Sequence, residues 1–380
     1  MDNTSLTERA ARHARYLAQT IGSRPAGSSA EKQAFDYIIH HLQNWGYYVE
    51  RLPAPYAPSP AVHYPYLVGV LALAGSGLAI SRFPWLVLGL PFLIAALPQW
   101  TIWAARERKP CAQSENVFAS VQPFVSPSGS NSGEEKNKDG VDMPYSSLIL
   151  VAHVDSARAL PFRSRFWLRL YSRTMDIIQR IAVMLSFLGV LHGVGFILPI
   201  GLLAAGKTLA VLTAAVWLFM QLWGIWRVDY SPGAVDNASG VGVLLALAEN
   251  FAGHMPEALR LGFLFTGAEE TGAHGSEAFA DQLREKGVQT AVINIDLAGA
   301  GDTLRYITSE GVYFPLRTDP QLNQMVRKVF PRALPLNETL RSGDHAPFIR
   351  RGFPTAALQT RGSPQAEQAY HTIHDTVELL

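Results

Sequence analysis

The stretch LILVAHVDS (148–156) decides the fold. It opens with five apolar residues, a run typical of a strand that is buried on both faces of a sheet. His153 and Asp155 follow, and because they are two positions apart they project to the same side of an extended chain. A neutral histidine can bind a metal ion through one ring nitrogen, while a nearby carboxylate fixes its tautomer. His-x-Asp is common, so this motif alone is weak evidence for a site.

Two more apolar strands are expected to end in carboxylates. One lies in ALRLGFLFTGAEETGAHGSEAF (258–279) and is followed by the adjacent Glu269 and Glu270. The other is AVINID (291–296), with Asp296 at its carboxyl end. Ligands of open α/β sheets gather at the carboxyl ends of the strands. Beside a metal ion, one of two adjacent glutamates can coordinate while the other accepts a proton from metal-bound water.

The remaining candidates lie in turns. Asp236 is in the Gly- and Ser-rich SPGAVDNASG (231–240), just before a helix expected to begin near Ser239. It is either an ordinary helix cap or a carboxylate that bridges two metal ions. His274 is expected to be a loop histidine rather than a ligand. The last two motifs, SGDHAPFIRRGFP and AYHTIHDT, supply Asp344, His345, His371, His374 and Asp375.

Together these motifs repeat one rule: a metal-competent side chain stands at the end of an apolar strand or in the turn after it. Five nitrogen and oxygen ligands with one bridging carboxylate suit two Zn²⁺ ions that keep open positions for water and substrate. The predicted ligands are His153, Asp236, Glu270, Asp296 and His371. The expected fold is α/β, a mixed and mostly parallel sheet sandwiched by helices, with the site at the carboxyl ends of the strands.

The composition narrows the class of protein. Of 380 residues, 48% are hydrophobic and only 17% are charged, below the usual quarter for soluble domains. The net charge of +1 gives no sign of a nucleic-acid partner. The single cysteine, Cys111, excludes an intramolecular disulfide framework and a Cys-rich zinc finger.

Four apolar segments explain the shortage of charge: 64–80, 83–105, 181–205 and 208–226. They contain no Lys, Arg, Asp or Glu, and their lengths are close to the roughly 20 residues needed to cross a bilayer. We expect them to pair into hairpins that turn at Ser81–Arg82 and Gly206–Lys207, and glycines in the first segment indicate a close helix–helix contact. Buried core helices of a soluble protein are the alternative interpretation.

An even number of spans leaves all of the polar sequence on one side of the membrane. Basic residues flank the segments on that side, whereas only Arg82 and Lys207 lie in the opposite turns. The positive-inside rule therefore predicts a multi-pass protein with about four spans and its polar part in the cytoplasm. The predicted domains are a catalytic part (1–62, 106–165 and 228–380), transmembrane hairpins (63–105 and 166–227) and a disordered loop (126–144).

The order of the motifs resembles a known family. Five motifs of this chain resemble signatures of the co-catalytic zinc aminopeptidases of metallopeptidase family 28: AHVDS, GAVDNASG, GAEETGAHGS, NIDLAG and YHTIHDT. That family includes bacterial leucyl aminopeptidases and aminopeptidase S. The stretch 21–50 also resembles the opening helix and first strand of that family. Five motifs in the same order make the resemblance specific. It covers nearly all of the chain except the apolar segments and the loop 126–144.

The resemblance implies a zinc-exopeptidase fold, also described as phosphorylase/hydrolase-like. It further implies an aminopeptidase that hydrolyses the amino-terminal peptide bond of peptides with water activated by two zinc ions. By motif, His153 and Asp296 would hold one zinc, Glu270 and His371 the other, and Asp236 would bridge them.

The resemblance also implies roles for residues that do not bind metal. Glu269 would be the general base, and Asp155 would orient His153. A cis peptide bond often follows the bridging aspartate in this family, which makes Asp236–Asn237 a candidate. The expected partners are peptide substrates and a lipid bilayer, since the two hairpins are inserts that soluble members lack.

Two alternatives stay open. SGDHAPFIRRGFP (342–354) resembles the corresponding stretch of glutaminyl cyclases, which share the fold, use one zinc and cyclise amino-terminal glutamine. A non-catalytic membrane scaffold is the other alternative. The complete ligand set argues against a scaffold, because a site without activity would be free to lose its metal-binding side chains.

Overall fold

The computed structural model describes residues 5–58, 63–80, 82–107, 109–121, 145–160, 164–226, 229–253, 259–311, 314–339 and 341–380. The predicted loop 126–144 lies outside these residues. The chain forms two compact units: Met1–Pro58, Lys109–Ala159 and Tyr230–Leu380 make the first, and Ser59–Arg108 and Leu160–Asp229 the second.

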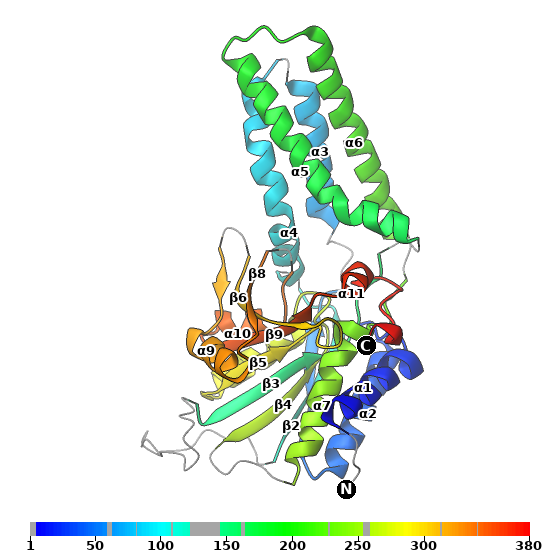
Figure 1. Ribbon diagram of the computed structural model, residues 1–380, viewed down its shortest axis with the longest axis vertical. Helices are drawn as coiled ribbons and strands as arrows, with labels where there is room; N and C mark the ends of the chain where they lie inside the picture. Colours follow the sequence, from blue (N-terminus) through cyan, green and yellow to red (C-terminus); the bar gives the residue numbers. More distant parts are fainter. Residues whose placement is uncertain are drawn as a thin grey trace. The chain divides into compact units, whose positions relative to one another are not determined.

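A mixed sheet forms the centre of the first unit (Figure 1). Within the described residues its order is β1 (Tyr48–Tyr56), β2 (Ala112–Ser120), β4 (Arg260–Thr266), β3 (Ser147–His153), β5 (Ala291–Ile295), β9 (Thr355–Arg361), β6 (Thr303–Glu310) and β7 (Leu316–Arg317), and β8 (Leu334–Glu338) pairs with β6. The central strands β4, β3, β5 and β9 are parallel. Most pairings outside them are antiparallel, and β6–β8 is the parallel exception among the described strands. The predicted mixed sheet is confirmed, and its parallel part is the centre, where the apolar runs of the sequence lie.

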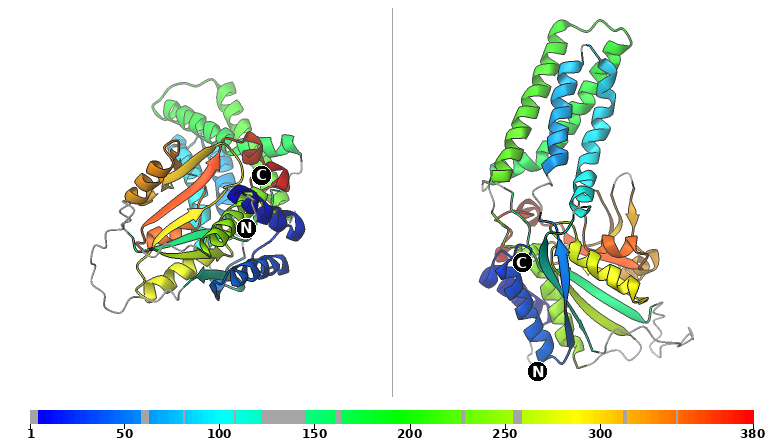
Figure 2. Two further views of the ribbon diagram at one scale, coloured as in Figure 1. Left: turned by 60° about the horizontal axis from the view of Figure 1, so that its bottom comes forward. Right: turned by 180° about the vertical axis from the view of Figure 1, so that it is seen from behind.

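Helices cover both faces of this sheet (Figure 2). Leu150 and Ala152 of β3 face the core that contains α1 (Leu6–Arg15), α2 (Ser29–Asn44) and α7 (Ser239–Phe251). The alternate residues Ile149 and Val151 face α8 (His274–Glu285) and α10 (His345–Arg350). The remaining elements of the unit are α9 (Pro320–Val329), α11 (Pro364–Ala369) and the short turns η1 (Tyr16–Ile21), η3 (Ala234–Ala238) and η4 (Val377–Leu379). Burial on both faces explains why the central strands read as continuous apolar runs.

The second unit is a helical bundle. It consists of α3 (His63–Ala79), η2 (Pro84–Gly89), α4 (Leu90–Arg106), α5 (Arg165–Gly193) and α6 (Ile200–Trp226). Two glycines of α3 bring it close to its neighbours: a Cβ added at Gly69 would lie 2.7 Å from the Trp217 ring, and one at Gly77 would lie 2.6 Å from Ala210 Cβ. The close helix contact expected in the first apolar segment is therefore confirmed.

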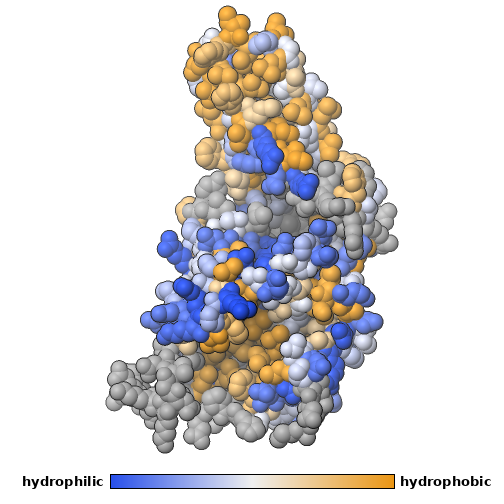
Figure 3. Space-filling view, in the orientation of Figure 1, coloured by the Kyte–Doolittle hydropathy of each residue, from blue (hydrophilic) through white to orange (hydrophobic). Residues whose placement is uncertain are grey.

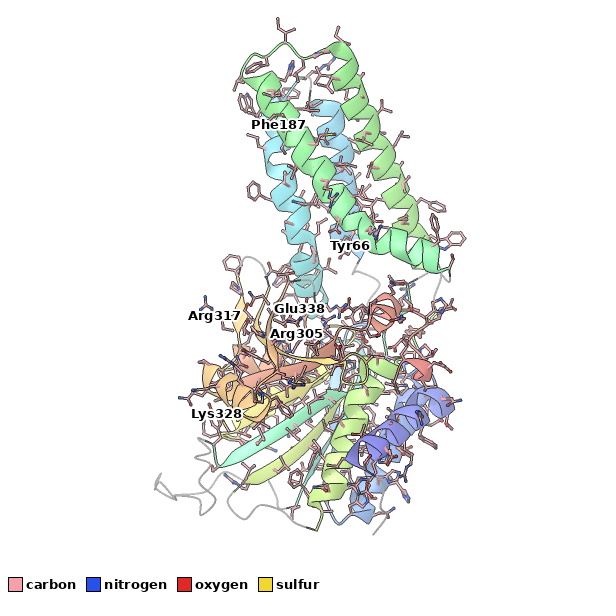
Figure 4. The ribbon with its side chains drawn as sticks, in the orientation of Figure 1. Tyr66, Phe187, Arg305, Arg317, Lys328 and Glu338 are labelled. Atoms are coloured by element: carbon pink, nitrogen blue, oxygen red, sulfur yellow. The ribbon has the colours of Figure 1, made fainter. Side chains whose placement is uncertain are left out.

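The outward surface of this bundle is apolar. Leu71 is 71% exposed and Phe187 is 62% exposed. Phe187 lies on the bundle (Figure 4), whose visible surface is mainly hydrophobic (Figure 3). Among the described residues, three helical stretches are long and apolar enough to cross a membrane, namely Pro84–Thr101, Asp176–Gly193 and Ile200–Trp223. The apolar stretch of α3, Tyr66–Ala79, is shorter.

One predicted turn is wrong. Gly206 and Lys207 lie inside α6, and the second hairpin reverses at 194–199 instead. Gly195 has a φ of 90°, which ends α5, and Pro199 directly precedes α6, where its missing N–H removes no helical hydrogen bond. The prediction followed the charge of Lys207, but glycine and proline control where a helix stops. The first hairpin turns at Arg82, as expected.

Candidate metal centre

The five predicted ligands come from different elements of the first unit. His153 ends β3, Glu270 follows β4, and Asp296 follows β5. Because these strands are parallel neighbours, their carboxyl ends lie at one edge of the sheet. Asp236 in η3 and His371 after α11 complete the group.

Asp236 joins two sets of metal-competent atoms. Its Oδ1 lies 3.2 Å from His153 Nε2, which in turn lies 3.6 Å from Asp296 Oδ1. Its Oδ2 lies 3.1 Å from His371 Nε2, which lies 3.2 Å from Glu270 Oε2. The structure therefore brings all five predicted side chains together as two triads that share one carboxylate.

The spacing of these atoms fits bound zinc. Ligand atoms that bind zinc tetrahedrally at 2.0–2.2 Å lie about 3.3–3.6 Å from one another, close to the separations found here. Several of the atoms are also buried without a hydrogen-bond partner among the described residues, including Asp236 Oδ2, Asp296 Oδ1 and His371 Nε2. A buried polar atom without a partner is costly unless something else, such as a cation, compensates for it.

The tautomer of His153 also indicates a site for a cation. Its Nδ1 lies 3.1 Å from the backbone carbonyl oxygen of Asp155, which can only accept a hydrogen bond. A proton on Nδ1 leaves the Nε2 lone pair facing the carboxylates of Asp236 and Asp296. Lone pair and carboxylates repel one another unless a proton or a metal cation lies between them.

Asp155 contacts different groups from those expected. Its carboxylate lies 3.7 Å from His153 Nδ1, farther than its own carbonyl oxygen. Instead, Oδ1 accepts the amide of Glu269 and Oδ2 the amide of Glu270, each at 3.1 Å. That this carboxylate orients His153 stays a prediction, with the two groups 3.7 Å apart, and the turn after β4 also points two successive amides at Asp155. Asp155 holds the backbone that carries both glutamates.

Asp236 is fixed by the segment near the carboxyl end of the described chain. Asp375 accepts the amide of Val235 at 2.8 Å and that of Asp236 at 3.0 Å. Asn237 donates from its side chain to the Ile295 carbonyl at 2.9 Å. The Asp236–Asn237 peptide bond is cis, as the family resemblance predicted.

Arg24 is a structural residue that the sequence analysis missed. Its fully buried guanidinium donates to the carbonyl of Val154 after β3 and to those of Pro232 and Gly233 before Asp236. It therefore ties together the backbones that carry two of the predicted ligands. Arg24 lies in the stretch 21–50 that carries the family resemblance, but its contacts with Val154, Pro232 and Gly233 span 130 to 209 positions and leave no local signal.

The charges of the site are strongly coupled. Burial raises the pKa of Glu269 well above its usual range, opposed by the attraction of His153. Burial likewise raises the pKa of Glu270 to about 7, opposed by His371. Burial lowers the pKa of His371, but Glu270 and Asp236 outweigh it and raise the pKa to about 10. Without a metal ion, the side chains of the site therefore bind protons, which supply positive charge among the carboxylates. A bound metal ion would displace these protons.

Other predicted candidates lie outside the two triads. Asp344 accepts a hydrogen bond from Thr266 at 2.6 Å, and His345 Nε2 lies 3.0 Å from Glu310 Oε2. His274 begins α8, so it is not a loop residue, and His374 lies in the turn after His371. Neither histidine belongs to a metal-competent group within the described residues.

Comparisons with known proteins agree with this geometry. Residues 224–380 match the model of peptidase family M28. Aminopeptidase YwaD of Bacillus subtilis (strain 168) is 30% identical over 163 residues, which cover 40% of this chain and 34% of that protein. A probable leucine aminopeptidase of Arthroderma benhamiae is 29% identical over 162 residues, covering 40% of this chain and 43% of that protein. The chain thus spans between a third and a half of the length of these relatives. The resemblance to metallopeptidase family 28 is confirmed.

Solved structures show the same fold. The zinc aminopeptidase BSAP from Bacillus subtilis superposes with a TM-score of 0.53 at 16% identity, covering 98% of this chain and 90% of that one. Porphyromonas gingivalis glutaminyl cyclase gives 0.55 at 14% identity, covering 98% and 91%. The first unit therefore has the zinc-exopeptidase fold, which aminopeptidases and glutaminyl cyclases share.

Proposed function

We propose that this chain is a zinc-dependent aminopeptidase anchored in a membrane by α3–α6. The observation that carries the proposal is the position of Asp236, whose two carboxylate oxygens each face a different histidine at 3.1–3.2 Å. A carboxylate shared in this way suits a pair of zinc ions better than a single one.

The residues that would hold the metal form two sets. His153 and Asp296 would bind one ion, Glu270 and His371 the second, and Asp236 both. Zinc at this position supplies Lewis-acid polarisation of the scissile carbonyl and a water of lowered pKa. This chain's part is to keep the donor atoms in place, through Arg24, Asp155 and Asp375.

Glu269 is the proposed general base. Its Oε2 lies 3.9 Å from His153 Nε2, and it forms a further metal-competent group with His153 and Glu270, but it belongs to neither of the two triads that share Asp236. Its side chain is 10% exposed, and its backbone is fixed by Asp155. From there it would accept the proton of the attacking water and deliver it to the departing amine.

The site is most open beside two of the ligands. Asp296 and His371 have side chains that are 24% and 32% exposed, whereas those of His153, Asp236 and Glu270 are at most 8% exposed. A peptide would therefore approach from the side of Asp296 and His371. We propose aminopeptidase rather than carboxypeptidase activity because the relatives compared above are named as aminopeptidases.

The membrane anchor is proposed from the second unit. The 17-residue helices α3 and α4 are each about 25 Å long, slightly short of a bilayer core of about 30 Å, but η2 extends α4 at its start, and α5 and α6 are longer. Four spans return the chain to the side that it left, and the basic flanks favour the cytoplasm for the first unit.

A panel of aminoacyl reporters tests the activity. Zinc-loaded, detergent-solubilised protein should release one amino-terminal residue, and a chelator should abolish the release. Formation of pyroglutamate from amino-terminal glutamine, without peptide hydrolysis, would instead assign the chain to the glutaminyl cyclases, whose fold it shares. Zinc binding without either product would leave a non-catalytic scaffold.

A further inference from the structure

A pocket adjoins the open side of the metal centre. It holds about 370 Å³ of empty space, part of which is open to solvent, and its lining includes the ligand Asp296 and the residue before His371, Tyr370. Its other walls come from β5, β9 and the segment after β8. A substrate bound at the metal centre would therefore place a neighbouring group in this pocket.

Two buried amides in this lining have atoms without a partner. Asn294 is 2% exposed and Gln359 is 5% exposed, yet neither Asn294 Oδ1 nor Gln359 Nε2 has a hydrogen-bond partner among the described residues. Asn294 pairs in register with Ala357, two positions before Gln359, so both amides stand on the same face of the sheet. Buried polar groups are almost always satisfied, so such a pair indicates a polar ligand.

The pocket lining contains one arginine, Arg341, besides the carboxylates of Asp296 and Glu338. The Arg341 guanidinium carbon lies 3.6 Å from the centre of the Tyr370 ring, which stacks on His371 at 3.8 Å. Arg341 has no carboxylate within ion-pair distance among the described residues. In contrast, Glu338 (Figure 4) is paired with Arg361 at 3.0 Å. The uncompensated charge of the pocket walls, apart from the metal ligand, is therefore positive.

We propose that Arg341 and Gln359 form a subsite for a carboxylate of the substrate, beside the metal centre. The inference rests on the proposed aminopeptidase function and names its substrate class. A guanidinium offers paired N–H donors to a carboxylate, and the Gln359 amide can donate to the same group. The carboxylate is either the side chain of an amino-terminal Glu or Asp, or the free carboxyl terminus of a dipeptide.

Matched substrates separate the two sources. If the side chain is recognised, a glutamyl reporter should have a kcat/KM roughly ten- to hundredfold above its neutral isostere, a glutaminyl reporter. If the carboxyl terminus is recognised, Leu-Ala should exceed Leu-Ala amide by a similar factor. Equal rates within both pairs, or faster cleavage of the neutral member, would overturn the proposal.

Variants link the preference to the pocket. Arg341→Leu should remove the preference and Arg341→Lys should restore part of it, while Arg332→Leu, a change of an exposed arginine outside the pocket, should leave it intact. An equal effect of the Arg332 and Arg341 changes would contradict a subsite at Arg341.

A binding measurement keeps the inference separate from the activity. L-glutamate should raise the thermal unfolding temperature of the zinc-loaded protein more than L-glutamine or L-leucine does, and Arg341→Leu should abolish the difference. To test carboxyl-terminal recognition, the same measurement compares Leu-Ala with Leu-Ala amide as ligands. It uses the Glu269→Gln variant, so that the peptides are not hydrolysed during the measurement. If no reporter is hydrolysed, the proposed function fails, and these shifts alone decide the subsite. Equal shifts in every pair would refute it.

Discussion

Asp375 accepts the backbone amide of Asp236 at 3.0 Å, across 139 positions of sequence. Its second oxygen takes the neighbouring amide of Val235. The residue that faces both histidines is therefore held from its backbone side by a carboxylate that belongs to no metal-competent group of the described residues. Supporting contacts of this kind orient the metal-binding side chains, and they thereby affect the metal affinity.

Replacing Asp375 with asparagine should weaken metal binding. The amide group of Asp375→Asn can accept with only one atom, so one of the two backbone amides would face an NH₂ group. We expect zinc affinity to fall by about 10- to 100-fold, as measured by competition with a metal indicator. Asp319→Asn, which alters a helix cap at α9 that accepts the amide of Leu322, is the matched control. Unchanged zinc affinity in Asp375→Asn would show that Asp236 does not depend on this contact.

The adjacent glutamates should behave differently when each is changed to glutamine. Glu269→Gln should keep its zinc and lose activity by roughly 10²–10⁴-fold, because only proton transfer is removed. Glu270→Gln should lose zinc, because its Oε2 belongs to the second triad. Zinc content by atomic emission and reporter hydrolysis distinguish the two variants. Equal zinc loss in both would contradict this division of roles.

His13 should make stability dependent on pH. Burial lowers its pKa from 6.5 to about 4, aided by His41, Arg12 and Arg9, and Tyr37 Oη lies 2.7 Å from its Nδ1. Because the unfolded chain binds the proton more tightly, its contribution is complete above pH 6.5 and is lost as the pH falls towards 4. The loss at pH 5 should be about 2 kcal/mol relative to pH 7.5.

Comparison with a variant isolates this contribution. His13→Gln should show a smaller fall in unfolding free energy between pH 7.5 and 5 than the wild type, in denaturant titrations of the detergent-solubilised protein. All other titrating groups are shared, so the difference between the two curves reports His13. Parallel curves would mean that His13 titrates normally in the folded state.

Cysteine labelling tests the topology of the bundle. Ile197 is 99% exposed in the turn between α5 and α6, and Arg82 lies in the turn after α3. In a Cys111→Ser background, Ile197→Cys and Arg82→Cys should both react with an impermeant reagent added outside intact cells. Cys111 itself should not react in the wild type. The reverse pattern would place the first unit outside the cell, and extraction by carbonate would rule out spanning helices.

The sequence predicted the parts of the site that follow from local pattern. His153, Glu270 and Asp296 each end or follow an apolar strand, and parallel strands bring such positions to one edge. The length and apolarity of the helical segments are equally local properties, so the bundle's helices were foreseen. The turn at 194–199 was missed, because glycine and proline ended the helix where hydropathy alone shows no break.

Only the tertiary structure decided what supports these residues and what lies beside them. Arg24 and Asp375 reach the ligand-bearing loops from distant positions, and Asp155 accepts two amides of the turn after β4, more than 110 positions away. The pairing of Arg341 with Tyr370 likewise exists only once the segment after β8 meets the end of α11. The strands, and the metal-competent residues at their ends, follow from hydrophobic periodicity and residue type, which a short window contains. Hydrogen bonds between loops far apart in sequence depend on how the chain folds back on itself, and no window contains that.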